Sequence, residues 1–187
     1  MKICWLLIIA LAILVSAQDQ TNARQPRFED YSVTEIFTAK PVPPLIQTPL
    51  EGMYRTRIRE GVMKGWGVER DGKEQPGPNF AGHYVIITWG CGSPCLMAAI
   101  VDLRTGRVFP PPFHHGPGHS YFQVPWAFPM DPLAYRVDSR LLIANICESD
   151  KTVRVEGRVS YEPQRCGTHY FLMSDNGPRL IYKFLEK

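Results

Sequence analysis

Residues 83–103 read HYVIITWGCGSPCLMAAIVDL and contain two apolar runs that flank a pair of cysteines. Both runs are rich in β-branched, aromatic and other apolar residues, which is typical of strands. Glycines and a proline lie between them, with Cys91 and Cys95, so the chain is expected to turn back there. The stretch therefore predicts two neighbouring strands joined by a short cysteine-containing turn.

Similar short segments continue to the C-terminus, separated by turn-forming residues. They are YFQVPWAF, AYRVD, RLLIANICE, TVRVEGRVSY, THYFLMS and RLIYKFL, and SDNGPRL between the last two is a clear hairpin signal. Before the strands, apolar residues such as Ile58 and Val62 recur at helical spacing. We predict a mainly β (α+β) fold: a single antiparallel twisted sheet system of hairpins with one N-terminal amphipathic helix, Glu51–Lys64.

The first 17 residues have the layout of a secretory signal peptide. Lys2 precedes an apolar run from Ile3 to Val15, and small residues then end at Ala17, where we place the cleavage. The run is shorter than the roughly 20 apolar residues of a membrane span. We predict a signal peptide over residues 1–17, an extended proline-rich arm over 18–49 and a single β-rich domain over 50–187. The processed protein is expected to be periplasmic or secreted, with no membrane association.

The charge balance argues against a nucleic-acid partner. The chain has 21 basic and 18 acidic residues, a formal net charge of +3, which becomes +2 once Lys2 leaves with the signal peptide. No cluster of basic residues alternates with aromatic ones, as a nucleic-acid surface would require. The expected partner is therefore a protein or a small molecule outside the cytoplasm.

Four cysteines remain in the processed chain, and an oxidising compartment favours their pairing. Three pairings exist, and we favour Cys91–Cys95 with Cys147–Cys166 because each bridge then joins neighbouring segments. The alternative is a nucleophilic thiolate at Cys91 or Cys95, activated by His83. That alternative needs a free thiol and two side chains within hydrogen-bond reach.

A larger pattern in the chain resembles a known set of proteins. The segments YRTRIREG, GPNFAGHYVIITWGCGSPC, DLRTGRVF and YRVDSRLLIA resemble an uncharacterised group of exported bacterial proteins. That group shares an N-F-x-G-H-Y…W-G-C-G-x-x-C segment followed by a D-x-x-T-G hairpin. The resemblance implies secretion and a common fold, but no reaction. Within the pattern, Gly82 is predicted to need a positive φ or a close approach of the backbone.

Histidines supply the metal candidates. His114, His115 and His119 lie in the loop FPPPFHHGPGHSYF, and imidazole nitrogens suit zinc or copper. The loop contains no carboxylate and is rich in proline and glycine, so we expect no dedicated cofactor and at most weak zinc or copper binding. His83 is expected either to satisfy a backbone carbonyl or to contact a ligand.

Two functional hypotheses follow. The favoured one is a disulfide-stapled binding or interaction module rather than an enzyme, and inhibition of a secreted hydrolase is one form of it. Its candidate surface comprises His83, Trp89, Trp66 and His115, presented with the loops at one end of the sheet. The alternative is a small metal- or Cys/His-dependent enzyme that uses His83 with Cys91, or the three loop histidines.

Overall fold

The computed structural model of the 187-residue chain describes most of the residues beyond position 23. The described residues are 24–65, 69–70, 73–74, 76–92, 95–113, 123–124, 132–148, 152–155, 158–161 and 165–185. Within these ranges, no helix is long and apolar enough to cross a bilayer. The predicted signal peptide lies outside the described residues.

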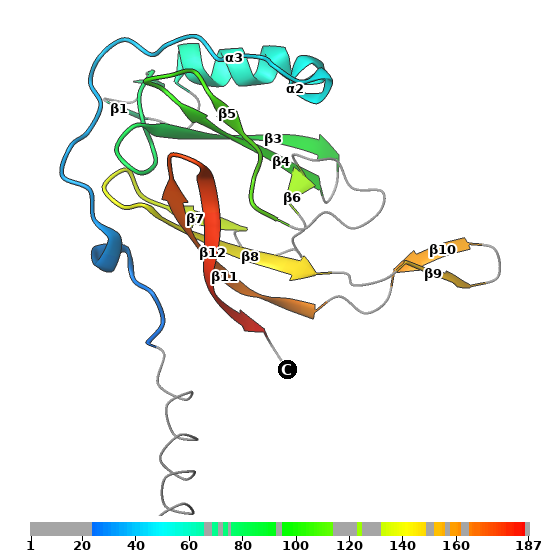
Figure 1. The fold of residues 1–187 in the computed structure, drawn as a ribbon. Helices are drawn as coiled ribbons and strands as arrows, with labels where there is room; N and C mark the ends of the chain where they lie inside the picture. The colour runs from blue at the N-terminus through cyan, green and yellow to red at the C-terminus, as the bar shows by residue number, and fades with distance from the viewer. Residues whose placement is uncertain are drawn as a thin grey trace, which may run out of the picture.

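The two strands predicted from residues 83–103 form the centre of one antiparallel sheet, here called the central sheet (Figure 1). β3 (Tyr84–Gly92) pairs along its length with β4 (Cys95–Asp102), and the register shifts by a bulge beside the cysteine turn. β5 (Val108–Phe109) and β6 (Gln123–Val124) also pair with β4. The strand prediction for this stretch is confirmed.

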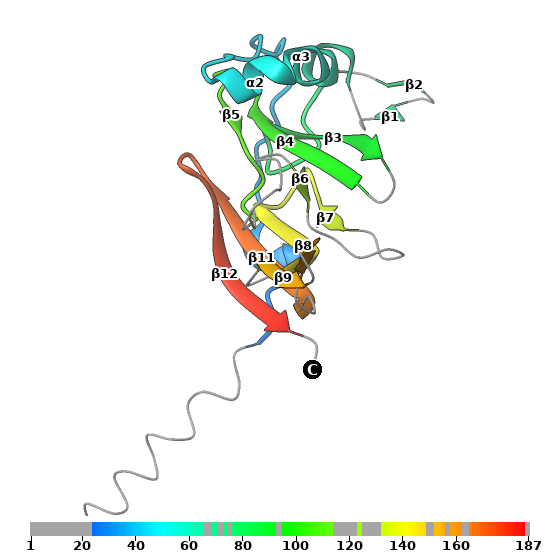
Figure 2. The same ribbon diagram turned by 90° about the vertical axis from the view of Figure 1, so that its right-hand side faces the viewer.

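A second antiparallel sheet, the outer sheet, lies below the central one in Figures 1 and 2. Its strands are β7 (Leu133–Tyr135), β8 (Leu141–Glu148), β11 (Arg165–Ser174) and β12 (Gly177–Leu185). Their spatial order is β12-β11-β8-β7. β11 and β12 are joined by a two-residue turn, which confirms the predicted hairpin.

The mainly β character is confirmed, but the prediction of a single sheet system is wrong. The reason lies in β3 and β4, which are buried on both faces because alternate residues point to opposite sides of a strand. Ile86 and Ile100 pack toward the outer sheet, whereas Val85 and Ile87 pack toward the helices. A strand that is apolar on both faces needs a cover on each side, and the outer sheet is one of them.

The predicted helix is divided in two and is not the first element of the fold. α2 (Pro49–Met53) begins with a capping box, in which the hydroxyl of Thr48 accepts a hydrogen bond from the backbone of Glu51. α3 (Arg55–Lys64) follows after Tyr54, whose φ of −103° and ψ of 9° leave the helical region. The Tyr54 ring lies 5.5 Å from that of Trp89, so the break coincides with a core contact.

Gly61 explains how closely α3 approaches the central sheet. A Cβ atom added there would lie 2.5–2.8 Å from side-chain atoms of Ile87, which is almost fully buried. Real Cβ atoms do not come so close, so the glycine is required by packing. Its low helix propensity is offset by this close contact.

Two short ribbons complete the described strands. β1 (Glu69–Arg70) pairs with β2 (Lys73–Glu74) in the loop that follows α3. β9 (Thr152–Val155) pairs with β10 (Arg158–Tyr161), so TVRVEGRVSY, which was predicted as one strand-like segment, forms a hairpin.

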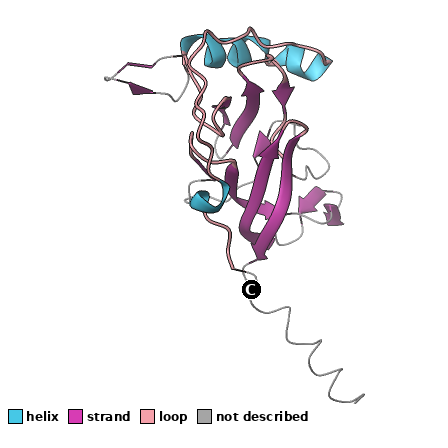
Figure 3. Cartoon of the chain, turned by 60° about the vertical axis from the view of Figure 1, so that its left-hand side comes forward, coloured by secondary structure: helices cyan, strands magenta, loops and turns pink. Residues whose placement is uncertain are grey.

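Residues 24–48, here called the strap, run along one side of both sheets before entering α2 (Figures 1 and 3). The strap lies within the predicted proline-rich arm of residues 18–49, and its described part contains one 3-10 turn, η1 (Phe28–Tyr31). Backbone hydrogen bonds attach it to the outer sheet side through Val33 and Tyr31, and to the central sheet side through Phe37, Val42 and Leu45. The strap therefore joins the two sheets.

Candidate functional site

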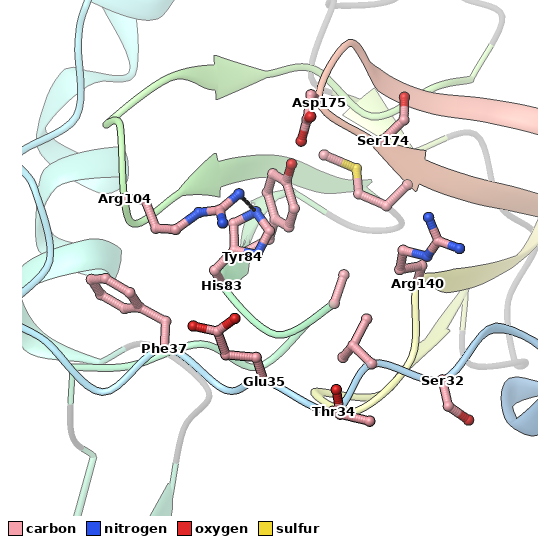
Figure 4. Close-up of a pocket in the computed structure, with 13 residues that line it drawn as sticks. Ser32, Thr34, Glu35, Phe37, His83, Tyr84, Arg104, Arg140, Ser174 and Asp175 are labelled. Carbon is pink, nitrogen blue, oxygen red and sulfur yellow. Dashed lines mark hydrogen bonds between the residues drawn. The ribbon is translucent and has the colours of Figure 1, made fainter.

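A cleft of about 500 Å³ opens where the strap passes both sheets (Figure 4). Five segments supply its walls: strap residues 32–37, the turn before β3, the β4–β5 turn, the residue before β8 and the β11–β12 turn. Its volume lies in the range of small-molecule sites, roughly 300–1,000 Å³. The cleft is thus built from parts that are distant in sequence.

The turn before β3 forms the meeting point of the strap and the two sheets. Ala81 and Gly82 both have positive φ, 46° and 79°. Their backbone N–H groups donate to carbonyls of the β7–β8 connection, and the Gly82 carbonyl accepts from Phe37 of the strap at 2.8 Å. A Cβ atom on Gly82 would lie 2.6 Å from the carbonyl oxygen of Glu35. Both predicted reasons for this glycine therefore apply.

Asn79 holds the entry to the same turn. Its side-chain amide donates to the carbonyl of Ile86 at 2.9 Å, and its side-chain carbonyl accepts from the Ile86 N–H at 2.7 Å. These two bonds replace a neighbouring strand at the edge of β3. Asn79 thus stabilises the turn and does not line the cleft.

The D-x-x-T-G turn between β4 and β5 positions an arginine at the cleft. The Asp102 carboxylate accepts from the Arg104 backbone N–H at 2.8 Å and from the Thr105 hydroxyl at 2.9 Å. Gly106 has a φ of 77°, and a Cβ atom there would clash with the carbonyl of Pro43 in the strap. The aspartate, threonine and glycine of this motif are therefore structural, and Arg104 is the residue they present.

Arg104 contacts His83 directly. Its Nη2 lies 2.6 Å from Nε2 of His83, and its Nε lies 3.8 Å from the Asp102 carboxylate. Because a guanidinium can only donate, Nε2 must accept, and the imidazole is then neutral with its proton on Nδ1. Burial is the main cause that lowers the pKa of His83, and the positive charge of Arg104 lowers it further. The carboxylates of Asp102, Asp175 and Glu35 act in the opposite direction.

Tyr84 lies beside this pair and is nearly buried. Its ring centroid is 4.1 Å from that of His83. Burial raises the pKa of Tyr84 to about 12, and the nearby carboxylates of Asp102 and Asp175 add to the effect. Tyr84 is therefore a neutral phenol at physiological pH and serves as a wall of the cleft.

Three further charged side chains face the cleft: Glu35 from the strap, Arg140 before β8 and Asp175 from the β11–β12 turn (Figure 4). Among the described residues, no ion pair or side-chain hydrogen bond engages any of the three. In hydrogen bonds with other described residues, Arg140 and Asp175 use only their backbone groups. The cleft therefore brings together charges that the described part of the protein does not neutralise.

The residues predicted for binding are dispersed. His83 lies in the cleft, whereas Trp89 is 7% exposed and packs under the helices. Trp66, His114, His115 and His119 lie outside the described residues. Within the described ranges, no group of three or more His, Cys, Asp or Glu side chains is placed to hold a metal ion.

The alternative hypothesis, in which His83 activates the thiol of Cys91, is not supported by the strand geometry. His83 immediately precedes β3, and Cys91 is the eighth residue after it, near the other end of the strand. At about 3.3 Å per residue, roughly 26 Å separates their backbones. Cys147 and Cys166, in contrast, are directly opposite each other in β8 and β11.

Sequence reasoning missed Glu35, Arg104, Arg140 and Asp175. They come from four segments that the fold brings together, and no local pattern links them. Only Arg104 had a signal, because it lies inside the D-x-x-T-G turn whose other polar residues serve the turn.

Comparison with known proteins finds no matching family model, no matching curated protein and no matching solved structure. The function is therefore inferred from the chemistry of the cleft.

Proposed function

We propose that this chain is an exported, disulfide-stapled binding module whose recognition site is the cleft beneath the strap. One observation carries the proposal. Arg104 is oriented at the cleft by His83 and Asp102, while other charged groups that face the same space have no described partner. A preoriented donor loses little freedom when a ligand binds, which favours affinity.

Binding accounts for the cleft better than catalysis does. A nucleophile needs an adjacent base, and His83 already uses Nε2 for Arg104. The hydroxyls of Ser32 and Ser174 donate to backbone carbonyls, at 2.9 Å and 2.8 Å. Within the described residues, the cleft thus offers polar contacts but no nucleophile in contact with a base.

The disulfides are part of the same proposal. Cys166 is disulfide-bonded, and Cys147 is the residue opposite it in the register. Opposite residues of antiparallel strands have Cα atoms about 4.5–5.5 Å apart, which suits a disulfide. Such a bridge would fasten the end of the outer sheet, as expected of a protein that works outside the cytoplasm. We also propose the Cys91–Cys95 bridge for the β3–β4 turn, where Cys91 lies in the bulge next to Gly92, the register partner of Cys95.

Thermal unfolding with a chemically diverse panel tests the proposed site. The panel contains carboxylic acids, phosphates, amines, sugars and short peptides. Thr34 lines the cleft and is exposed, with no side-chain hydrogen bond among the described residues, so Thr34→Trp should fill the site. Thr38→Trp is the matched control, because Thr38 is an exposed strap residue outside the cleft.

We expect at least one class of compound in the panel to raise the unfolding temperature of the wild type and of Thr38→Trp but not that of Thr34→Trp. A ligand present at 100 times its Kd adds about 2.7 kcal/mol, which corresponds to roughly 5–10 °C for a protein of this size. The proposal is wrong if no class has an effect, or if Thr34→Trp responds as strongly as the control.

A further inference from the structure

The ligand class can be inferred from the charges of the cleft, given the proposed binding function. Two guanidinium groups, Arg104 and Arg140, and two carboxylates, Glu35 and Asp175, line it. His83 adds no charge while it accepts from Arg104. The described part of the lining is therefore close to neutral in sum, although it contains four full charges.

These charges are not evenly distributed. Glu35 and Asp175 lie on the same side of the cleft as His83 in Figure 4, and they come from opposite walls, the strap and the β11–β12 turn. Arg104 is at the same end, but Asp102 offsets part of its charge. Arg140 lies on the other side of the cleft in Figure 4. One end is thus negative in sum and the other end is positive.

This distribution disfavours two simple kinds of ligand. A phosphate or other anion without a positive group would face Glu35 and Asp175, and an amine without a negative group would face Arg104 and Arg140. Like charges brought together across an interface cost several kcal/mol. A ligand that carries both charges meets complementary groups at each end and avoids the cost.

Apolar side chains complete the lining. Val33, Phe37 and Met173 contribute to the cleft, and Met173 is fully buried beneath it. They provide a surface for a small aliphatic group between the two charged ends.

We propose that the cleft binds a small zwitterion of the amino-acid or short-peptide class, with its ammonium group between Glu35 and Asp175 and its carboxylate at Arg140. Ser32 and Ser174 lie on the same side of the cleft as Arg140 (Figure 4), but backbone carbonyls already accept from their hydroxyls, so Arg140 is the donor to the carboxylate. Arg104 is fixed by His83 and Asp102 at the same end, where it can donate to a carbonyl oxygen of the ligand, and Asp102 offsets part of its positive charge near the ammonium group.

Isothermal titration calorimetry with defined probes tests this proposal. The probes are alanyl-alanine, N-acetyl-alanyl-alanine, which lacks the ammonium group, alanyl-alanine amide, which lacks the carboxylate, and inorganic phosphate. The processed protein is compared with Arg140→Gln and Glu35→Gln, and with Arg179→Gln as the control. Arg179 is exposed on β12 and does not line the cleft.

We expect alanyl-alanine to bind at least ~10-fold more tightly than either blocked peptide, as loss of one charge-assisted contact implies. Arg140→Gln should weaken alanyl-alanine by a similar factor and leave the amide unchanged. Glu35→Gln should weaken alanyl-alanine and leave the acetylated peptide unchanged. Arg179→Gln should bind all probes as the wild type does.

Equal binding of the blocked peptides, or no binding of alanyl-alanine, would overturn the zwitterion proposal. If phosphate or another panel member binds in the cleft instead, the binding function still holds and only the ligand class is wrong. If no compound of the wider panel binds, both the zwitterion proposal and the proposed binding function are wrong.

Discussion

Replacing Gly82 by alanine tests whether the strap is held as closely as the structure indicates. Gly82 has a φ of 79°, and its new Cβ atom would lie 2.6 Å from the Glu35 carbonyl oxygen and 3.3 Å from the Val33 side chain. A non-glycine residue in the left-handed region costs about 1–2 kcal/mol. The strap must also move, which weakens the hydrogen bond from Phe37 to Gly82, a contribution of about 1 kcal/mol.

The sum predicts that Gly82→Ala lowers the free energy of unfolding by about 2–3 kcal/mol, or the unfolding temperature by roughly 5–10 °C. Urea unfolding followed by intrinsic fluorescence measures the change. Gly90→Ala is the control: Gly90 lies in β3 without a positive φ, and no described atom lies within 4 Å of an added Cβ atom. It should change stability by no more than about 0.5 kcal/mol.

Limited proteolysis separates a loosened strap from general instability. In Gly82→Ala, cleavage within residues 24–48 should accelerate under conditions in which the sheets stay intact. If Gly82→Ala is as stable as Gly90→Ala and its strap is equally protected, then the strap does not depend on close contact with this glycine, and the reasoning is wrong.

Three other predictions concern packing, cross-links and pH. Gly61→Ala should destabilise the protein by about 1–3 kcal/mol, because its methyl group meets the buried side chain of Ile87. Gly52→Ala, where no described atom lies near the new methyl group, should instead stabilise α2 by up to about 1 kcal/mol. Chemical unfolding measures both changes, and equal effects would refute the packing argument. Peptide mapping without reduction should recover Cys147 linked to Cys166, and removing that bridge should cost about 3 kcal/mol; a free thiol at either position contradicts it. Because the pKa of His83 is lowered in the folded protein, the unfolded chain binds more protons below about pH 6.5. The free energy of unfolding should therefore fall as the pH drops from 7.5 to 5.5, and it should fall less in His83→Gln. An equal decline in both proteins would exclude His83 as a cause.

The strands were predictable because their signals are local. The apolar runs of β3 and β4 and the turn residues between β11 and β12 indicate their structure without knowledge of the remaining chain. The number of sheets was not predictable in the same way. A strand that is apolar on both faces needs an element packed on each face, but its sequence does not indicate whether that element is a helix or a second sheet.

The cleft was largely hidden for a similar reason. His83 attracted attention as a histidine at the start of a strand, but Glu35, Arg140 and Asp175 are ordinary surface charges in the sequence. These three side chains converge only because the strap, which contains Glu35, runs along both sheets. Contacts between residues separated by more than a hundred positions leave no periodic signal.

The attachment of the strap also constrains the order in which the molecule can be completed. The main-chain partners of residues 31–45 lie between residues 82 and 140, so the segment that leaves the ribosome early can dock only after much later segments have taken their places. The strap is thus seated after segments that follow it in the chain, and the cleft, one wall of which it forms, is complete only once it has docked.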